Sequence, residues 1–371
     1  MNDTLKNKDV ERIYFPELDG LRFFAFLLVF IFHFKLFAHI PWLSPIEKNG
    51  WIGVDLFFTL SAFLFTKLLM AEFEKTKTIS FKKFYLRRIF RIWPLYFLFI
   101  VFSVALCFYF TGPAMKSILL RTAGLFLFSD NILSAMYGYN TMLYIGHLWT
   151  ISYEEQFYIF IPFIILLLAR SSFKTKVILV ITAFILLNLV RSFFIIKNVP
   201  HPAIWVLPVT HFESIILGTV MGFGGLDFLL KKIPPLIIGL LSIFFFALVC
   251  LMPNINHISY WLIASYFCIG MATSLLLYAV LNSAILKKIF SNKTLIFLGK
   301  RSYGLYVFHT LGNGFAAYVI SHVSILPSFR LAEFIYSLLF TITVAVISYK
   351  ILEAPFLKLK KKFEIIVSRP V

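Results

Sequence analysis

The sequence predicts an all-α integral membrane protein, built as one bundle of about ten transmembrane helices. Hydrophobic residues make up 60% of the 371 positions, aromatic residues 19% and charged residues only 14%, and the mean hydropathy is +0.88. Soluble globular domains are much more polar than this. Apolar runs recur along the whole chain, and each is close to the roughly 20 residues that a helix needs to cross a bilayer core of about 30 Å.

The ten expected spans follow from these runs. They are residues 21–40, 51–71, 92–111, 148–169, 176–196, 204–223, 235–252, 258–282, 302–322 and 331–353. We find no internal repeat and no linker between them, so residues 1–371 are expected to form a single transmembrane domain with no additional soluble domain.

The distribution of basic residues predicts the orientation. With the N-terminus in the cytoplasm, 25 of the 35 Lys and Arg residues fall on the inner side and five in outer loops. Cytoplasmic loops of membrane proteins are enriched in Lys and Arg, so both termini are expected to be cytoplasmic. The same bias accounts for the net charge of +18 without a nucleic-acid partner.

Two connections are longer than the others. Residues 72–91 alternate basic and aromatic side chains, which predicts a helix lying at the cytoplasmic interface. Residues 111–147 have an apolar centre that is too short to span, which predicts an outer, re-entrant or cavity-capping loop. The three cysteines lie in apolar runs without metal-ligand spacing, so no metal site is expected.

The first expected span contains two ionisable residues, Arg22 and His33. All ten residues between them are apolar. At about 100° per residue, a spacing of eleven returns to within roughly 20° of the same helix face, about 16 Å along the axis. Ionisable groups inside a bilayer usually serve a function. The alternative is that Arg22 extends to the membrane edge and His33 only packs in the interior.

Six segments together resemble the membrane acyltransferase 3 family, the O-acyltransferases that modify bacterial polysaccharides, lipopolysaccharide, peptidoglycan and some small molecules. They are Leu18–Arg22 (LDGLR) with His33 after ten intervening residues, Gly53–Leu64 (GVDLFFTLSAFL), Arg87–Tyr96 (RRIFRIWPLY), His147–Tyr158 (HLWTISYEEQFY), Ser302–His309 (SYGLYVFH) and Leu352–Phe356 (LEAPF). The resemblance covers nearly the whole chain. Ala62 is a departure, because the family usually has Gly there.

The resemblance implies a bundle that takes an acyl group from cytosolic acyl-CoA, most simply acetyl-CoA, and delivers it to a hydroxyl group. It implies that Arg22 and His33 are essential, and a neutral imidazole is also a suitable general base. It assigns Arg88 and Arg91 to the phosphates of coenzyme A, which guanidinium groups can bind through paired hydrogen bonds. Without the resemblance, attraction of anionic lipid or the fixing of topology would be the favoured interpretation of these two arginines.

Further polar residues of the same segments are candidates for substrate binding or support of the site. They are Asp55, Ser61, Glu154, Glu155, Ser302, Tyr306 and His309. We expect Asp55 to meet Arg22 or His33 across helices, unless it lies at the outer interface. Glu154 and Glu155 begin the fourth expected span, and one of them is expected to orient a histidine or to bind an acceptor sugar. The alternative is that both are solvated at the outer membrane edge. Ser302, Tyr306 and His309 share one helix face and are expected to line the cavity of His33, or else to join helices by hydrogen bonds.

The sequence therefore predicts a multi-pass O-acetyltransferase of the bacterial cytoplasmic membrane, acting on a cell-surface glycan or its lipid-linked precursor. Its expected partners are membrane lipid and a carbohydrate acceptor, with direct transfer favoured over a separate extracytoplasmic transfer partner. The alternative is a glycolipid or anion transporter or flippase without acyl-transfer chemistry, because buried ionisable groups also mark translocation paths.

Overall fold

The computed structural model describes residues 12–36, 40, 42–110, 115–322 and 330–368, and most of these are helical. The longer helices are α1 (Pro16–Phe34), α3 (Ile52–Thr76), α4 (Phe81–Phe110), α7 (Trp149–Arg170), α8 (Phe173–Ile196), α12 (Pro235–Leu251), α13 (Trp261–Asn282), α16 (Ser302–His322) and α17 (Arg330–Ser348). The shorter helices are α2 (Ser44–Lys48), α5 (Met115–Phe126), α6 (Asp130–Tyr137), α9 (Ala203–Val206), α10 (Glu213–Gly222), α11 (Asp227–Leu230), α14 (Ala284–Phe290), α15 (Lys293–Gly299) and α18 (Ala354–Lys360). A π-helical turn, Tyr349–Glu353, joins α17 to α18, and a 3₁₀ turn, Lys361–Phe363, follows α18.

Six helical segments are long and apolar enough to cross a membrane. They are α3, α4, α7, α8, α13 and the continuous segment Arg330–Phe363. Two shorter helices, α10 and α12, are also apolar. The all-helical membrane class is thus confirmed for the described residues, whereas the expected ten spans and the orientation of the termini stay predictions.

Two expected segments differ from the structure. The expected span 204–223 is interrupted, because α9 ends at Val206 and α10 begins only at Glu213. Pro208 lies in the interruption and cannot donate a helical backbone hydrogen bond. Residues 72–91 do not form a separate helix: their beginning completes α3, and from Phe81 onward they belong to α4, which continues through Pro94 to Phe110.

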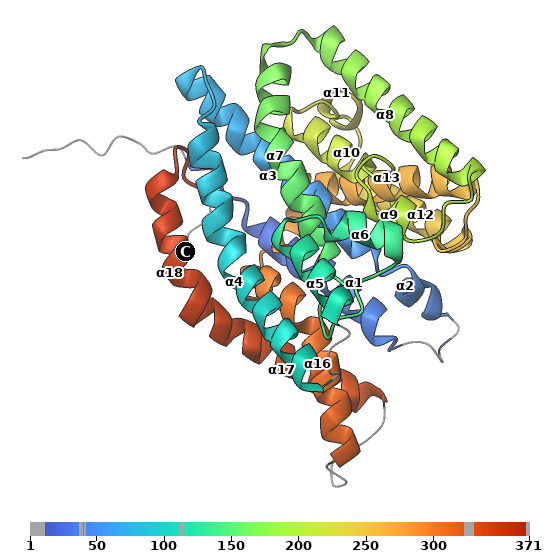
Figure 1. Ribbon diagram of the computed structural model, residues 1–371. Helices are drawn as coiled ribbons and strands as arrows, with labels where there is room; N and C mark the ends of the chain where they lie inside the picture. Colours follow the sequence, from blue (N-terminus) through green and yellow to red (C-terminus); the bar gives the residue numbers. More distant parts are fainter. Residues whose placement is uncertain (1–11, 37–39, 41, 111–114, 323–329, 369–371) are drawn as a thin grey trace, which may run out of the picture.

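The helices that hold the candidate catalytic residues lie in the middle of the bundle. In Figure 1, α4, α17 and α18 lie on one side and α8, α10 and α12 on the other, with α1, α3 and α7 between them. Glycine brings α1 and α3 together, since a Cβ atom at Gly53 would overlap the Ala25 carbonyl oxygen. The face of α1 that includes Phe26 and Phe30 is fully buried, so α1 is fixed tightly among its neighbours.

The contact of α3 with α10 explains how the chain accommodates Ala62. The Ala62 side chain is completely buried and faces Gly218 of α10. A Cβ atom at Gly218 would lie 3.1 Å from that of Ala62 and 2.5 Å from the Thr59 carbonyl oxygen. At this crossing the close approach therefore depends on the glycine of α10.

Candidate active site

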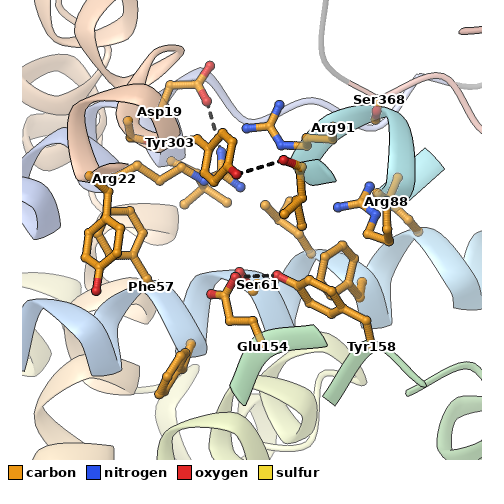
Figure 2. Close-up of a pocket in the computed structure, with 18 of the residues that line it drawn as sticks. Asp19, Arg22, Phe57, Ser61, Arg88, Arg91, Glu154, Tyr158, Tyr303 and Ser368 are labelled. Carbon is orange, nitrogen blue, oxygen red and sulfur yellow. Dashed lines mark hydrogen bonds and ion pairs between the residues drawn. The ribbon is translucent and has the colours of Figure 1, made fainter. Parts of the chain in front are cut away.

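A first cavity, which we call the arginine cavity, lies around the N-terminal half of α1. Its ionisable and hydroxyl-bearing lining residues are Tyr14, Asp19, Arg22, Ser61, Arg88, Arg91, Thr150, Glu154, Tyr158, Ser302, Tyr303, Tyr306, Lys360 and Ser368. Figure 2 shows Arg22 on one side of it and Arg88 on the other, with Arg91 between them and Glu154 below. Three guanidinium groups and one ammonium group thus surround one space, which suits a ligand with several negative charges.

Acidic partners hold part of this charge in place. The Arg22 guanidinium donates to Asp19 Oδ1 at 3.0 Å, and the Tyr14 hydroxyl donates to Asp19 Oδ2 at 2.9 Å. On the opposite wall, the Tyr158 hydroxyl donates to Glu154 Oε2 at 2.7 Å. Lys360 forms an ion pair with Glu364 at 3.1 Å. Arg22 is therefore oriented by its own helix.

Consecutive arginines of α4 have different surroundings. Arg87 pairs with buried Glu72 at 3.4 Å and donates to the Phe363 carbonyl oxygen at 2.9 Å. Arg88 instead lies over the Phe65 ring, with its guanidinium carbon 4.5 Å from the ring centroid, and its Nε is buried without a hydrogen-bond partner. A planar cation held against an aromatic ring keeps its donors available. Arg88 is thus placed for a ligand, and Arg87 for structure.

A second cavity, which we call the histidine cavity, lies at the C-terminal end of α1. It is lined by Val29, Phe32, His33, Trp51, Val54, Tyr139, Tyr144, Ile145, Gly146, His147, Trp149, Thr150, His201, Trp205, Asn254, Ile255, Asn256, Tyr306 and Thr310. His33 has an exposed side chain at this cavity, whereas the arginines of the first cavity are absent from its lining.

The hydrogen bonds of His33 define which ring nitrogen is basic. His33 Nδ1 lies 2.9 Å from the Val29 carbonyl oxygen. Because a carbonyl oxygen only accepts, Nδ1 must hold the proton, and Nε2 is left with a free lone pair. His309 Nδ1 likewise donates to the Tyr306 carbonyl oxygen at 2.6 Å, so its Nε2, 3.3 Å from His33 Nδ1, is also an acceptor. His33 Nε2 is therefore the nitrogen that can accept a proton. In the protonated ring, the Nδ1–H would still face two acceptors, the Val29 carbonyl oxygen and His309 Nε2.

A third histidine completes this cluster. The ring centroids of His147 and His309 lie 4.5 Å apart, and the His147 side chain is buried. His147 precedes α7 and enters the bundle interior, beside Tyr306 of α16. The start of α7 therefore lies inside the bundle, beside the histidine cluster.

The two cavities meet at three shared residues, Val54, Thr150 and Tyr306. The hydroxyl groups of Thr150 and Tyr306 are 2.7 Å apart, and the Tyr306 hydroxyl also donates to the His147 carbonyl oxygen at 3.1 Å. The three polar residues of one α16 face, Ser302, Tyr306 and His309, therefore differ in which cavity they line. Ser302 lines only the arginine cavity, Tyr306 lines both, and His309 lies behind His33 rather than on either lining.

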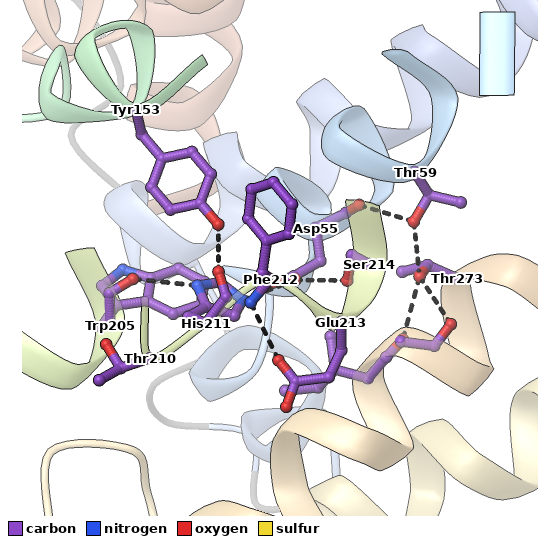
Figure 3. Close-up of polar contacts among 12 residues, drawn as sticks. Asp55, Thr59, Tyr153, Trp205, Thr210, His211, Phe212, Glu213, Ser214 and Thr273 are labelled. Carbon is purple, nitrogen blue, oxygen red and sulfur yellow. Dashed lines mark hydrogen bonds and ion pairs between the residues drawn. The ribbon is translucent and has the colours of Figure 1, made fainter. Parts of the chain in front are cut away.

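Asp55 is not where the sequence suggested. Its Oδ1 accepts from His211 Nε2 at 2.8 Å and from Ser214 at 2.6 Å, so it meets neither Arg22 nor His33. Figure 3 shows this network, in which the His211 ring also stacks on Trp205 with centroids 4.4 Å apart. The expectation was wrong because the interruption between α9 and α10 brings His211 inward, which the apolar pattern did not reveal.

The two glutamates of α7 also differ from expectation. Glu154 lines the arginine cavity and is only partly exposed, so it is not a solvated residue of the outer edge. Glu155 faces a separate pocket with Arg88, Trp93 and Gln156, and its Oε1 is buried without a partner. Both glutamates differ from the expectation for the same reason: α7 begins deep in the bundle, so its first turns are interior. Ser61, by contrast, lies on the arginine cavity with Arg22.

Sequence reasoning missed Lys360, Tyr158 and Thr150 as lining residues of the cavities. Lys360 belongs to a basic run after the last expected span, which was attributed only to topology. Further along the chain, Val367 forms an isolated β-bridge with Arg12. Both ends of the described chain therefore lie beside the arginine cavity, which Ile13 and Ser368 help to line. Only the fold brings these residues next to Arg88 and Arg91.

Comparison with known proteins identifies the family of the chain. A family model described as an acyltransferase domain matches residues 15–350. The chain belongs to the acyltransferase 3 family. A Staphylococcus aureus strain COL protein named "Putative O-acetyltransferase" is 30% identical over 93% of this chain and 58% of its own length. The O-acetyltransferase OatA of S. aureus strain NCTC 8325 is 30% identical over 96% of this chain and 60% of its own length.

This member of the acyltransferase 3 family therefore spans about three fifths of the length of the curated relatives it matches. No solved structure shows a significant match to the chain. The family and the apolar helices together identify it as a membrane protein.

Proposed function

We propose that the protein is a membrane O-acetyltransferase that moves an acetyl group from acetyl-CoA to a hydroxyl group of a cell-surface glycan or its lipid-linked precursor. The observation that supports this most is the meeting of two chemically different cavities at Thr150 and Tyr306. One is cationic and suits the phosphates of coenzyme A. The other presents a histidine with a free ring nitrogen, which suits a hydroxyl acceptor.

In the proposed reaction, Arg88 and Arg91 bind the phosphates of coenzyme A, and the thioester lies towards Tyr306. His33 Nε2 accepts the proton of the acceptor hydroxyl as that oxygen attacks the thioester carbonyl carbon. The carbon–sulfur bond then breaks, and the proton passes from His33 to the leaving thiolate. Val29 and His309 accept hydrogen bonds from Nδ1 and so stabilise the imidazolium that forms.

The oxyanion that develops on the thioester carbonyl needs hydrogen-bond donors. The Tyr306 and Thr150 hydroxyl groups lie where the cavities meet and are candidates. Both are within donating distance of the His147 carbonyl oxygen, so one of them would have to turn its proton to the oxyanion. Arg22 is held by Asp19 on the donor side and would orient the thioester or stabilise this charge. The N-terminal half of α1 is then the cytoplasmic half, in the cytoplasmic membrane of a bacterium.

The test compares wild-type cells with cells that produce His33→Ala. We expect the O-acetyl content of the surface glycan to fall by about 10²- to 10⁴-fold, the usual contribution of a general base. Export of the glycan itself should not change. A transporter would show the reverse, with export lost. Full acetylation by His33→Ala would remove the catalytic assignment.

Direct transfer is distinguished from a covalent intermediate by trapping. The purified protein is incubated with radiolabelled acetyl-CoA in the absence of acceptor and then denatured. Direct transfer leaves the protein unlabelled. Stable label on a side chain would show that an acetyl-enzyme forms first.

A further inference from the structure

The histidine cavity has a composition unlike that of the arginine cavity. Three tryptophans and three tyrosines line it, together with the amides Asn254 and Asn256. Trp205 stands against both other indoles, with ring centroids 4.8 Å from Trp51 and 5.6 Å from Trp149. These residues come from the starts of α3 and α7, the segment before α7, α9, the segment between α12 and α13, and α16, so the wall is assembled from distant parts of the chain.

Among the described residues that line this cavity there is no Asp, Glu, Lys or Arg. At its rim, the hydroxyl of Tyr139 and Nε2 of His201 are hydrogen-bonded at 2.9 Å. Desolvation raises the pKa of the Tyr139 phenol and lowers the pKa of His201, so both side chains are neutral at pH 7. A ligand carboxylate or phosphate would therefore lose its water without gaining a counter-charge, which costs several kcal/mol.

The cavity also contains a polar group without a protein partner. The indole N–H of Trp51 is buried and makes no hydrogen bond among the described residues. Buried donors are nearly always paired in folded proteins, so an unpaired donor at a cavity indicates a ligand group or water that completes it. Aromatic walls with a few such polar groups are typical of sites for ligands that are apolar on one face and polar at their edges.

We propose that the histidine cavity is the acceptor site and that it binds an uncharged sugar ring. This rests on the proposed function and specifies its acceptor. The ring packs its C–H face on the aromatic side chains, and a ring hydroxyl accepts from the Trp51 N–H. Another hydroxyl then faces His33 Nε2, at the place where the two cavities meet. Charged sugars, such as uronic acids, are excluded from this position.

The test uses the purified full-length protein in detergent and two probes that differ only at C6, methyl β-glucopyranoside with a hydroxymethyl group and methyl β-glucuronide with a carboxylate. Binding is measured by saturation-transfer NMR without acetyl-CoA. We expect the neutral glycoside to bind at least about tenfold more tightly than the glucuronide, as a lost hydrogen bond or an uncompensated charge would produce. The same comparison with methyl β-galactopyranoside and its uronide guards against a preference for one stereoisomer.

Variants then locate the site. Trp51→Phe keeps a six-membered aromatic ring and removes the N–H together with the pyrrole part of the indole, so it should weaken neutral glycoside binding by at least about three- to tenfold. Trp42→Phe is the matched control, because Trp42 is 76% exposed and lies away from the cavity. Asn256→Ala, at an exposed position of the rim, should also weaken binding and tests the site independently of the tryptophan packing.

The inference is overturned if neither neutral glycoside binds, if the uronides bind equally well, or if neither Trp51→Phe nor Asn256→Ala changes the affinity. Acetyl-CoA binding is measured calorimetrically on the same samples. If acetyl-CoA binds and the glycosides do not, only the acceptor assignment fails. If the glycosides bind and acetyl-CoA does not, the proposed acetyltransferase function fails while the sugar site remains.

Discussion

Arg87 and Arg88 are consecutive in α4 but have different surroundings, which predicts that their substitution has different effects on acetyl-CoA binding. Within the part of the chain that the structure describes, Arg88 forms no ion pair and lies on Phe65, whereas Arg87 is paired with Glu72. A charge-assisted hydrogen bond to a buried or partly buried phosphate contributes about 1.5–3 kcal/mol. Removing the Arg88 guanidinium should therefore raise the Kd for acetyl-CoA by roughly 10- to 150-fold.

The assay is calorimetric titration of the detergent-solubilised protein with acetyl-CoA. Arg88→Ala should show the full loss, and Arg88→Lys an intermediate loss, because lysine keeps the charge but not the planar pair of donors. Lys83→Ala is the matched control, since it removes an exposed positive charge from the same helix. Its affinity for acetyl-CoA should stay within about twofold of wild type.

Arg87→Ala provides the contrasting outcome. It leaves the Glu72 carboxylate buried without its partner, so thermal stability should fall, by about 3–5 kcal/mol in the free energy of unfolding. Any remaining folded protein should bind acetyl-CoA normally. The reasoning is refuted if Arg88→Ala binds acetyl-CoA as wild type does, or if Lys83→Ala weakens binding as much as Arg88→Ala.

Three further predictions concern the support of the site. Gly53→Val should destabilise the protein by about 1–3 kcal/mol through overlap with Ala25, while Gly239→Ala, whose added Cβ would have its nearest atom at 3.7 Å, should be neutral or stabilising in thermal unfolding. Arg191→Met should lower the free energy of unfolding by about 3–5 kcal/mol, because it leaves the Glu213 carboxylate buried without its ion-pair partner. The double variant Arg191→Met, Glu213→Met should recover most of this loss of stability. No recovery would show that the ion pair is not the cause. His309→Gln should lower kcat about tenfold and shift the kcat–pH profile with little change in the KM for acetyl-CoA, and an unchanged kcat and profile would count against its role beside His33.

The sequence could predict the features that depend on local pattern. The long apolar helices follow from hydropathy. The R-x-x-R spacing of Arg88 and Arg91 places both guanidinium groups on one helix face, and the structure has both on the arginine cavity. The eleven-residue spacing of Arg22 and His33 likewise predicts one stripe of α1, along which the structure places the two cavities in succession.

What could not be predicted depends on where chain segments enter the bundle. A hydropathy count treats each apolar run as a full span that starts at a membrane surface. The segment before α7 instead brings His147 against His309 in the interior, which moves Glu154 onto the arginine cavity. Similarly, the break before α10 gives Asp55 a histidine partner from a distant part of the chain. These contacts are tertiary, and a single sequence contains no local signal for them.

The central claim is that donor and acceptor reach one reaction centre from opposite ends of the bundle, through the arginine cavity and the histidine cavity. The direct measurement uses proteoliposomes that contain the full-length protein, with radiolabelled acetyl-CoA on one side of the membrane and the acceptor glycan on the other. We expect label to appear on the glycan in this arrangement, to depend on His33, and to be absent when both substrates are supplied on the same side. Transfer only when both are on the same side would contradict the account.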